Sequence, residues 1–232
     1  MKPTRLLIGL TATFATVIGL AGTGPEARLV GGANLAPAAA YAAAVPQPAR
    51  FPTSWQLDFD YGKLRRIVVE TPGSRIPQAY WYLPFEVTNN TDEAQLFLPV
   101  FDMVTRDGRV IRSDVAVSPT VFRRIKATAN LEFARPLLEV AGRIPVGQDQ
   151  TRSSVAIWKE PDPEMGSFSI FVAGLSGEMT TVPGVDGQPL TDADGEPILL
   201  RKSRQLEYRV LGDELYPGQD PIELVNDTWV MR

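Results

Sequence analysis

The chemistry open to this chain is bounded by two residue types that it lacks. Its 232 residues include no histidine and no cysteine. Histidine is the commonest general base and metal ligand, and cysteine supplies thiolate nucleophiles, thiolate metal sites and disulfides. Serine, lysine and carboxylate mechanisms are left. A binding or scaffold module needs neither missing residue, so that class is favoured.

One group of acidic residues could hold a metal ion: Asp186, Asp192, Asp194 and Glu196. The run at 192–196, DADGE, resembles the start of a calcium loop. Calcium takes roughly 6–8 oxygen ligands, and the helix-flanked loop needs a glutamate at its last position, where this chain has Ser203. The calcium motif therefore fails, and a hairpin turn with Gly195 at positive φ explains the same residues.

Tyr80, Tyr82 and Glu86 are the candidate ligand-binding residues. In the run YWYLPFEV, at 80–87, these three share one side of an extended chain. If that side is open, the rings form an aromatic platform beside the carboxylate, suited to sugars or proline-rich segments. Contiguous exposed aromatic patches are uncommon on monomers, so a covering by a helix or by the C-terminal segment is favoured.

Paired carboxylates are the remaining route to an enzyme, because two of them can cleave a glycosidic bond. The pairs are Asp58 with Asp60, Asp162 with Glu164, and Asp213 with Glu214. No Gly-x-Ser-x-Gly or Ser-x-x-Lys motif accompanies them. Carboxylate pairs are common by chance, so no catalytic residue is assigned and no cofactor is expected.

The elements that must position these residues are mostly strands. Trp81, Leu83, Phe85 and Val87 alternate with other side chains at a period of two, which is typical of a strand with one buried face. Further runs that predict strands lie at 55–60, 64–70, 96–104, 110–111, 153–158, 167–173, 198–202, 206–211 and 229–231. Turn residues between them recur at the roughly 8–12-residue spacing of a sandwich or barrel.

One helix interrupts the strands. Ser118 and Pro119 match an N-cap and first turn, and apolar residues from Val121 to Ala129 recur at helical spacing. A second helical turn is predicted between Asn130 and Ala134, ended by Pro136. The predicted fold is mainly β: an antiparallel β-sandwich with one or two short helices inserted near 118–135 and a long C-terminal β arm.

Two spaced patterns carry a family resemblance. Val87, Asn89 and Thr91 match a turn of the form V-x-N-x-[ST], and Phe101, Met103, Asp107 and Gly108 match F-x-[LM]-x-x-x-D-G. The segment 80–110 thereby resembles the middle of immunoglobulin-like domains of exported bacterial proteins of unknown function. Residues 144–148, IPVGQ, are similar to the later I-x-P-G-x pattern, with Val146 inserted. The resemblance implies an immunoglobulin-like sandwich in the envelope and assigns no catalytic residue.

The N-terminus is typical of an export signal. Lys2 and Arg5 precede an uncharged run at 6–22, and small-residue cleavage patterns follow up to Ala44. The uncharged run is near the ~17-residue lower limit for a membrane span, so an uncleaved anchor stays open. We expect residues 1–44 to be a signal peptide or anchor, 45–53 an Ala/Pro linker, and 54–232 a single domain.

Net charge bears on the partner. The whole chain carries −4, and losing residues 1–44, with three basic residues and one acidic, leaves about −6. A mildly acidic domain has no basic footprint for nucleic acid and no polybasic handle for anionic lipid. The expected partner is an envelope protein or glycan, with membrane contact only through the N-terminal segment.

These observations together predict an exported, non-enzymatic binding or structural module of the bacterial cell envelope, periplasmic or extracellular. Two alternatives stay open. One is a carboxylate-dependent hydrolase acting on envelope glycans. The other is a membrane-anchored accessory subunit that keeps residues 6–22.

Overall fold

Antiparallel strands make up most of the part of the chain that the structure describes. The computed structural model describes residues 46–70, 76–161, 166–184, 187–211 and 222–232. The elements in chain order are β1 (Asp58–Tyr61), β2 (Arg65–Val69), β3 (Gln78–Asn89), β4 (Gln95–Phe97), β5 (Val100–Thr105), β6 (Val110–Arg112), α1 (Pro119–Thr128), α2 (Leu137–Val140), β7 (Gly142–Ile144), β8 (Gly147–Lys159), β9 (Ser167–Ala173), β10 (Met179–Thr181), β11 (Leu199–Val210) and β12 (Ile222–Met231). The mainly β class is confirmed. Neither α1 nor α2, the helices of this described part, combines the length and apolar character that crossing a bilayer requires.

The first sheet is built around β3. Strand β8 pairs antiparallel with β3 along one edge, and β1 and β2 pair with it in succession along the other. The chain bends between β1 and β2 at Gly62, whose N–H donates to Pro84 O at 2.8 Å. The two short strands therefore act as halves of one bent edge strand, and the bend lies beside the middle of β3.

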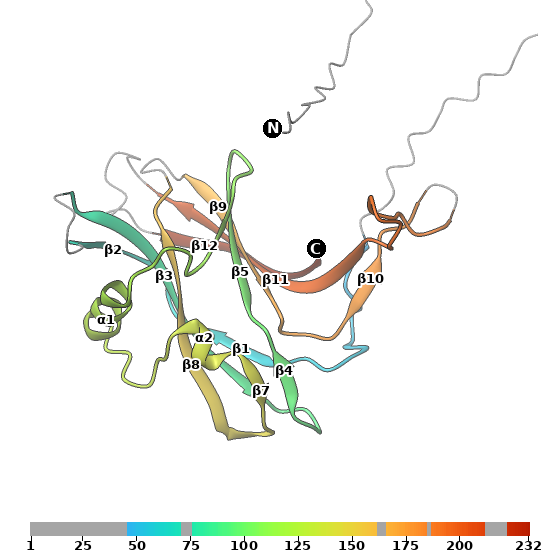
Figure 1. Cartoon of the computed structure of the whole chain (residues 1–232), viewed down its shortest axis with the longest axis horizontal. Coiled ribbons are helices and arrows are strands. Elements are labelled where there is room, and N and C mark those ends of the chain that lie inside the picture. The colour runs from blue at the N-terminus through green and yellow to red at the C-terminus, as the bar shows by residue number, and fades with distance from the viewer. Residues whose placement is uncertain (1–45, 71–75, 162–165, 185–186, 212–221) are drawn as a thin grey trace, which may run out of the picture. The chain divides into compact units, whose positions relative to one another are not determined.

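The second sheet has the order β6, β5, β9, β11, β12, and β10 pairs with β11 beyond the end of β9. Strands β11 and β12 pair along their length, with one register shift near Tyr208. The C-terminal strands are therefore part of this sheet. A small separate pair, β4 with β7, continues from β5 at one end of the domain (Figure 1).

One apolar core receives side chains from both sheets. The first sheet supplies Trp81, Leu83, Phe85 and Val87, which are at most 3% exposed, so the predicted inward face of β3 is confirmed. The second sheet supplies Phe101, Met103, Ile170, Val172 and Leu206. The rings of Phe85 and Phe101, one from each sheet, have centroids 4.7 Å apart. Aromatic packing of this kind adds to the free energy of burial.

The outer face of the first sheet is covered in part by α1. Ser118 is the N-cap and Pro119 the first helical residue, as predicted. Val121 and Ile125 are fully buried in a second apolar cluster that includes Tyr80 and Tyr82 of β3. Figure 1 shows α1 on the side of β3 that faces away from β5. Strand β3 is therefore buried on both faces along the part that α1 covers.

The second helix differs from the prediction. Residues 130–134 form turns, and α2 instead spans Leu137–Val140, beyond the predicted 118–135 region. The prediction used Pro136 as a helix stop, whereas Pro136 is the N-cap of α2, with φ of −53°. Proline is tolerated at a helix start because the first N–H groups have no intrahelical acceptor.

Three predicted strand runs also differ from the structure. The run at 96–104 is divided into β4 and β5 at Leu98 and Pro99, because proline has no N–H for the ladder. Gly174 sits beside that break with φ of 90°, and a Cβ there would collide with Leu98 O. The runs at 198–202 and 206–211 form one continuous strand, β11, which pairs with β9 along one edge and with β12 along the other.

Candidate functional site

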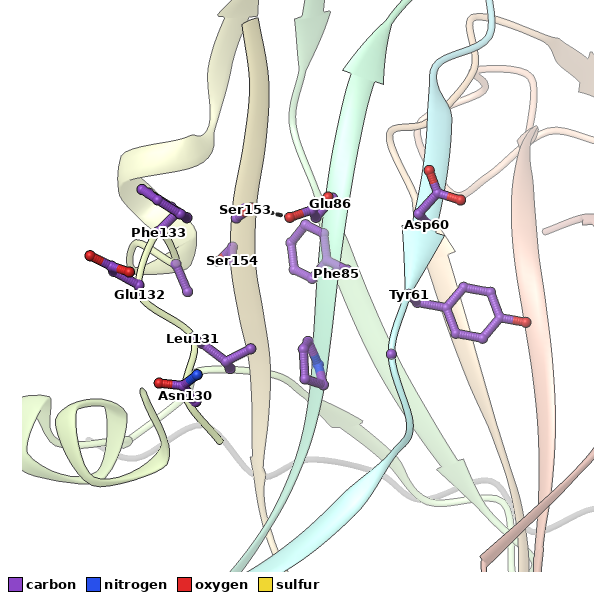
Figure 2. A pocket seen from close by; sticks show the side chains of 13 residues that line it. Asp60, Tyr61, Phe85, Glu86, Asn130, Leu131, Glu132, Phe133, Ser153 and Ser154 are labelled. Carbon is purple, nitrogen blue, oxygen red and sulfur yellow. Dashed lines mark hydrogen bonds between the residues drawn. The ribbon is translucent and has the colours of Figure 1, made fainter. Parts of the chain in front are cut away.

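A hollow of about 320 Å³ lies on the outer face of the first sheet, next to the chain that follows α1. Its floor is β3 at Pro84–Glu86 and β8 at Ser153 and Ser154. One wall is the loop 130–134, and the other is the bend 60–62 between β1 and β2. Figure 2 shows the loop side chains on one side of β8 and β3 and Asp60 on the other.

The loop wall follows α1 and is anchored to α1 and β8 at its C-terminal end. Asn130 follows α1 with φ of 54°, a left-handed conformation that asparagine tolerates. Lys126 Nζ donates to Ala134 O at 2.9 Å, which holds the loop back against α1. Arg135 N donates to Ser153 O at 3.0 Å, and Ser154 Oγ donates to Arg135 O at 2.7 Å. The loop is thus tied to β8, yet it leaves Phe133 79% exposed at the rim.

Three carboxylates line the hollow, from β1, β3 and the loop 130–134. Asp60 of β1 and Glu86 of β3 are directly opposite in antiparallel register, so they share the outer face of the sheet. Ser153 Oγ donates to Glu86 Oε1 at 2.7 Å, which orients that carboxylate across the floor (Figure 2). Glu132 belongs to the loop wall. Asp60, Glu86 and Glu132 are exposed, and no basic side chain lines this hollow among the described residues.

A second hollow of about 700 Å³ continues from the first and shares Glu86, Phe133 and Ser153 with it. Its further lining comes from β8 at 148–152 and from Arg135, Glu139 and Val140. The guanidinium of Arg152 donates to Val140 O at 2.6 Å and also to Arg143 O, so backbone carbonyls already hold it. We call the two hollows together the outer groove.

The structure separates the predicted ligand-binding residues. Tyr80 and Tyr82 are 5% and 3% exposed beneath α1, so they form no open platform in this structure. The covering by a helix, favoured from the sequence, is what the structure shows. Glu86 lies on the same face of β3 but beyond the helix, and it is exposed in the outer groove.

The acidic residues of the predicted metal site form a turn where they are described. Asp192 Oδ1 accepts hydrogen bonds from Asp194 N at 2.9 Å and from Glu196 N at 3.0 Å. Gly195 has φ of 85°, as the hairpin-turn interpretation predicted. Asp186 lies outside the described residues. Within the described ranges, no group of three or more acidic residues has a geometry that could hold a metal ion.

Of the predicted carboxylate pairs, only Asp58 with Asp60 lies within the described residues, and the two side chains have different partners. Asp58 accepts a hydrogen bond from Asn90 Nδ2 at 2.6 Å, while Asp60 lies opposite Glu86. The pair that the fold creates is therefore Asp60 with Glu86, which no sequence spacing indicated. The other two pairs, Asp162 with Glu164 and Asp213 with Glu214, lie outside the described residues.

A separate polar network lies at the inner face of β11 and was not predicted. Tyr61 OH donates to Asp227 Oδ2 at 2.6 Å, and Arg204 forms an ion pair with the same carboxylate. Burial, then the hydrogen bond and charge of Asp227, raise the pKa of Tyr61 to about 12. Tyr61 is therefore a neutral donor at physiological pH. In Figure 2 its ring points away from the loop wall, so this network is distinct from the outer groove.

No family model, curated protein or solved structure matches this chain. Function therefore has to be inferred from the outer groove itself. Its carboxylates accept hydrogen bonds and attract cations, and its exposed ring offers apolar contact. Because the groove is open to solvent, it suits reversible recognition better than chemistry that needs water excluded.

Proposed function

We propose that this protein is an exported, non-enzymatic binding module of the bacterial cell envelope, whose ligand occupies the outer groove. One observation carries the proposal. The loop 130–134 follows α1 directly and is tied to α1 and β8 at its C-terminal end, yet it holds Phe133 79% exposed above a floor where Ser153 orients Glu86. An anchored, exposed aromatic side chain beside an oriented polar group is typical of a recognition site.

An immunoglobulin-like sandwich is the proposed scaffold. Two antiparallel sheets feed one apolar core, as in a sandwich, and the turns at Asn89 and Gly108 follow the sequence patterns of that family. Asn89 supports its turn directly, since its Oδ1 accepts hydrogen bonds from Thr91 N at 3.0 Å and Thr91 Oγ1 at 2.7 Å.

Export is proposed from the N-terminal charge and hydropathy pattern, and a non-enzymatic role from the absence of histidine and cysteine. The carboxylate-dependent hydrolase is the second candidate, because Asp60 and Glu86 lie side by side in the groove. Both side chains are exposed, and a glycosidase acid needs an environment that keeps it protonated at neutral pH. Binding without turnover is therefore the better supported of the two.

The test compares the exported wild-type protein with Phe133→Ser. Immobilised protein is incubated with envelope glycan fragments and with envelope protein extract, and retained ligands are quantified. We expect the wild type to retain a ligand that Phe133→Ser loses. Phe51→Ser is the matched control, because Phe51 is 82% exposed and does not line the outer groove.

Two results would contradict this proposal. If the wild type and Phe133→Ser retained equal amounts of ligand, the outer groove would not be the binding site. Glycan turnover that Glu86→Gln abolishes would instead establish the hydrolase. The mass of the intact exported protein separates a cleaved signal from the anchored alternative, which would retain residues 6–22.

A further inference from the structure

We infer that the outer groove takes a basic polypeptide segment, with a lysine or arginine side chain placed among Asp60, Glu86 and Glu132. This inference rests on the proposed binding function and goes beyond it by naming the class of ligand. The alternative occupant is a glycan, which would be neutral or acidic, and the test below distinguishes it from a basic segment.

The first argument is an uncompensated repulsion. Asp60 and Glu86 occupy directly opposite positions on paired strands, where like charges are destabilising. Glu132 adds a third carboxylate from the loop wall. Within the described part of the chain none of the three forms an ion pair, and the hydrogen bond from Ser153 to Glu86 brings no positive charge. A cation from a partner would relieve this repulsion, whereas a neutral sugar would not.

The second argument comes from Phe133 at the rim. A ring that is 79% exposed beside carboxylates can pack against the methylene stem of lysine or arginine and lie under its charged group. Basic side chains combine an apolar stem with a cationic end, and the hollow combines an exposed aromatic ring with carboxylates in its lining. The two match in both respects.

The third argument is the extent and charge of the whole groove. Its two hollows, of about 320 and about 700 Å³, exceed what one ammonium group fills, and they are contiguous through Glu86 and Ser153. The described lining holds five carboxylates, namely Asp60, Glu86, Glu132, Glu139 and Asp149, against two guanidinium groups, Arg135 and Arg152. Arg152 is already bound to backbone carbonyls. An extended segment with more than one basic residue fits this length and sign.

The test uses labelled peptides and fluorescence anisotropy. The probes are a peptide of about ten residues that alternates glycine with lysine, and its glycine–glutamate counterpart, at an ionic strength low enough for surface charges to act. We expect the wild type to bind only the lysine peptide. The variant Asp60→Asn/Glu86→Gln should bind it about tenfold more weakly, the effect of losing two charged contacts.

A charge-matched control separates the groove from net charge. The variant Asp194→Asn/Glu196→Gln changes the total charge equally at an exposed turn outside the groove, and it should bind the lysine peptide like the wild type. Thermal melting checks folding. Removing two facing like charges should leave the melting temperature of the groove variant unchanged or raised, so weaker binding will not reflect unfolding.

Three outcomes would overturn the inference. Equal weakening in both double variants would mean attraction to net charge alone. Free spermine binding as tightly as the peptide would make the ligand a small amine. No lysine-peptide binding by the wild type, while Phe133→Ser still loses its envelope ligand, would leave the groove as the binding site but remove the basic segment as its occupant.

Discussion

Lys202 Nζ lies 2.9 Å from Glu178 Oε2, in an ion pair whose side chains are only 4% and 10% exposed. The other oxygen of Glu178 accepts a hydrogen bond from Ala49 N at 2.7 Å. The Lys202 ammonium also lies 5.2 Å from the centroid of the Trp229 ring, on β12. The pair therefore joins β11 to Ala49, which lies in the segment predicted as a linker.

We expect Lys202→Met to lower the free energy of unfolding by about 3–5 kcal/mol, because it leaves the buried Glu178 carboxylate without a compensating positive charge. The double variant Lys202→Met/Glu178→Gln should lose less than the sum of the two single variants, since it removes both charges. Urea denaturation of the four proteins measures this coupling. Strictly additive losses would show that the two side chains do not stabilise each other.

Phe85→Ala should lower the free energy of unfolding by about 3–5 kcal/mol, through lost burial and a cavity in the core. Phe85 is 3% exposed and contacts the ring of Phe101 in the second sheet. The same substitution at Phe51, which is 82% exposed, should change stability by no more than about 0.5 kcal/mol. Similar values at the two sites in chemical denaturation would mean that the shared core is assigned wrongly.

Asp114 should make stability depend on pH. Burial raises the pKa of its carboxyl from 3.8 to about 6, against weaker opposing effects of hydrogen bonds from the Ser113 side chain and at the Ile157 backbone. A raised carboxyl pKa means that the folded state keeps the proton longer than the unfolded state. The free energy of unfolding therefore falls as pH rises from about 4 to about 6, by on the order of 2–3 kcal/mol.

Asp114→Asn should remove that dependence and be more stable than the wild type above about pH 7, because no charge is then buried. Asparagine also tolerates the backbone here, where φ is 61°. Chemical denaturation of both proteins across this pH range measures their free energies of unfolding. The difference between the two isolates Asp114, because all other groups titrate in both proteins. If the wild type instead became more stable than Asp114→Asn as pH rises, the raised pKa of Asp114 would be contradicted.

Calcium should not bind the turn at 192–196. Asp192 Oδ1 is already occupied by the N–H groups of Asp194 and Glu196, and the described residues there bring no further clustered ligands. A calorimetric titration of the whole chain with calcium should show no saturable heat, and the melting temperature should not move. Saturable binding that Asp192→Asn abolishes would restore the predicted metal site.

The residues of β3 show how much of the fold the sequence alone could predict. The alternation at Trp81, Leu83, Phe85 and Val87 identified a strand and its inward face, because a strand's side-chain period is a local property. The N-cap Ser118 and the turn at Gly195 were predictable for the same reason. Pro136 was misassigned, since the same fixed φ suits the end of one helix or the start of another.

The outer groove needed information that no local pattern holds. Asp60 meets Glu86 only because β1 pairs with β3 in one register, and a shift of one residue would have placed them on opposite faces. Phe133 is exposed at the rim of a loop that Lys126 of α1 holds at Ala134 and that Ser154 of β8 holds at the adjoining Arg135. Whether Tyr80 and Tyr82 were open likewise depended on where α1 packed.

The sequence by itself determined a mainly β protein without histidine or thiol chemistry, with a buried face on β3 and a helix after Ser118, because composition, period and capping act within a few residues. Only the tertiary structure decided that α1 covers the tyrosines, that Glu86 stays exposed, and that Asp60 faces it. Those outcomes depend on strand register and on packing between distant segments, whose free energies are set by contacts formed only when the whole chain has folded.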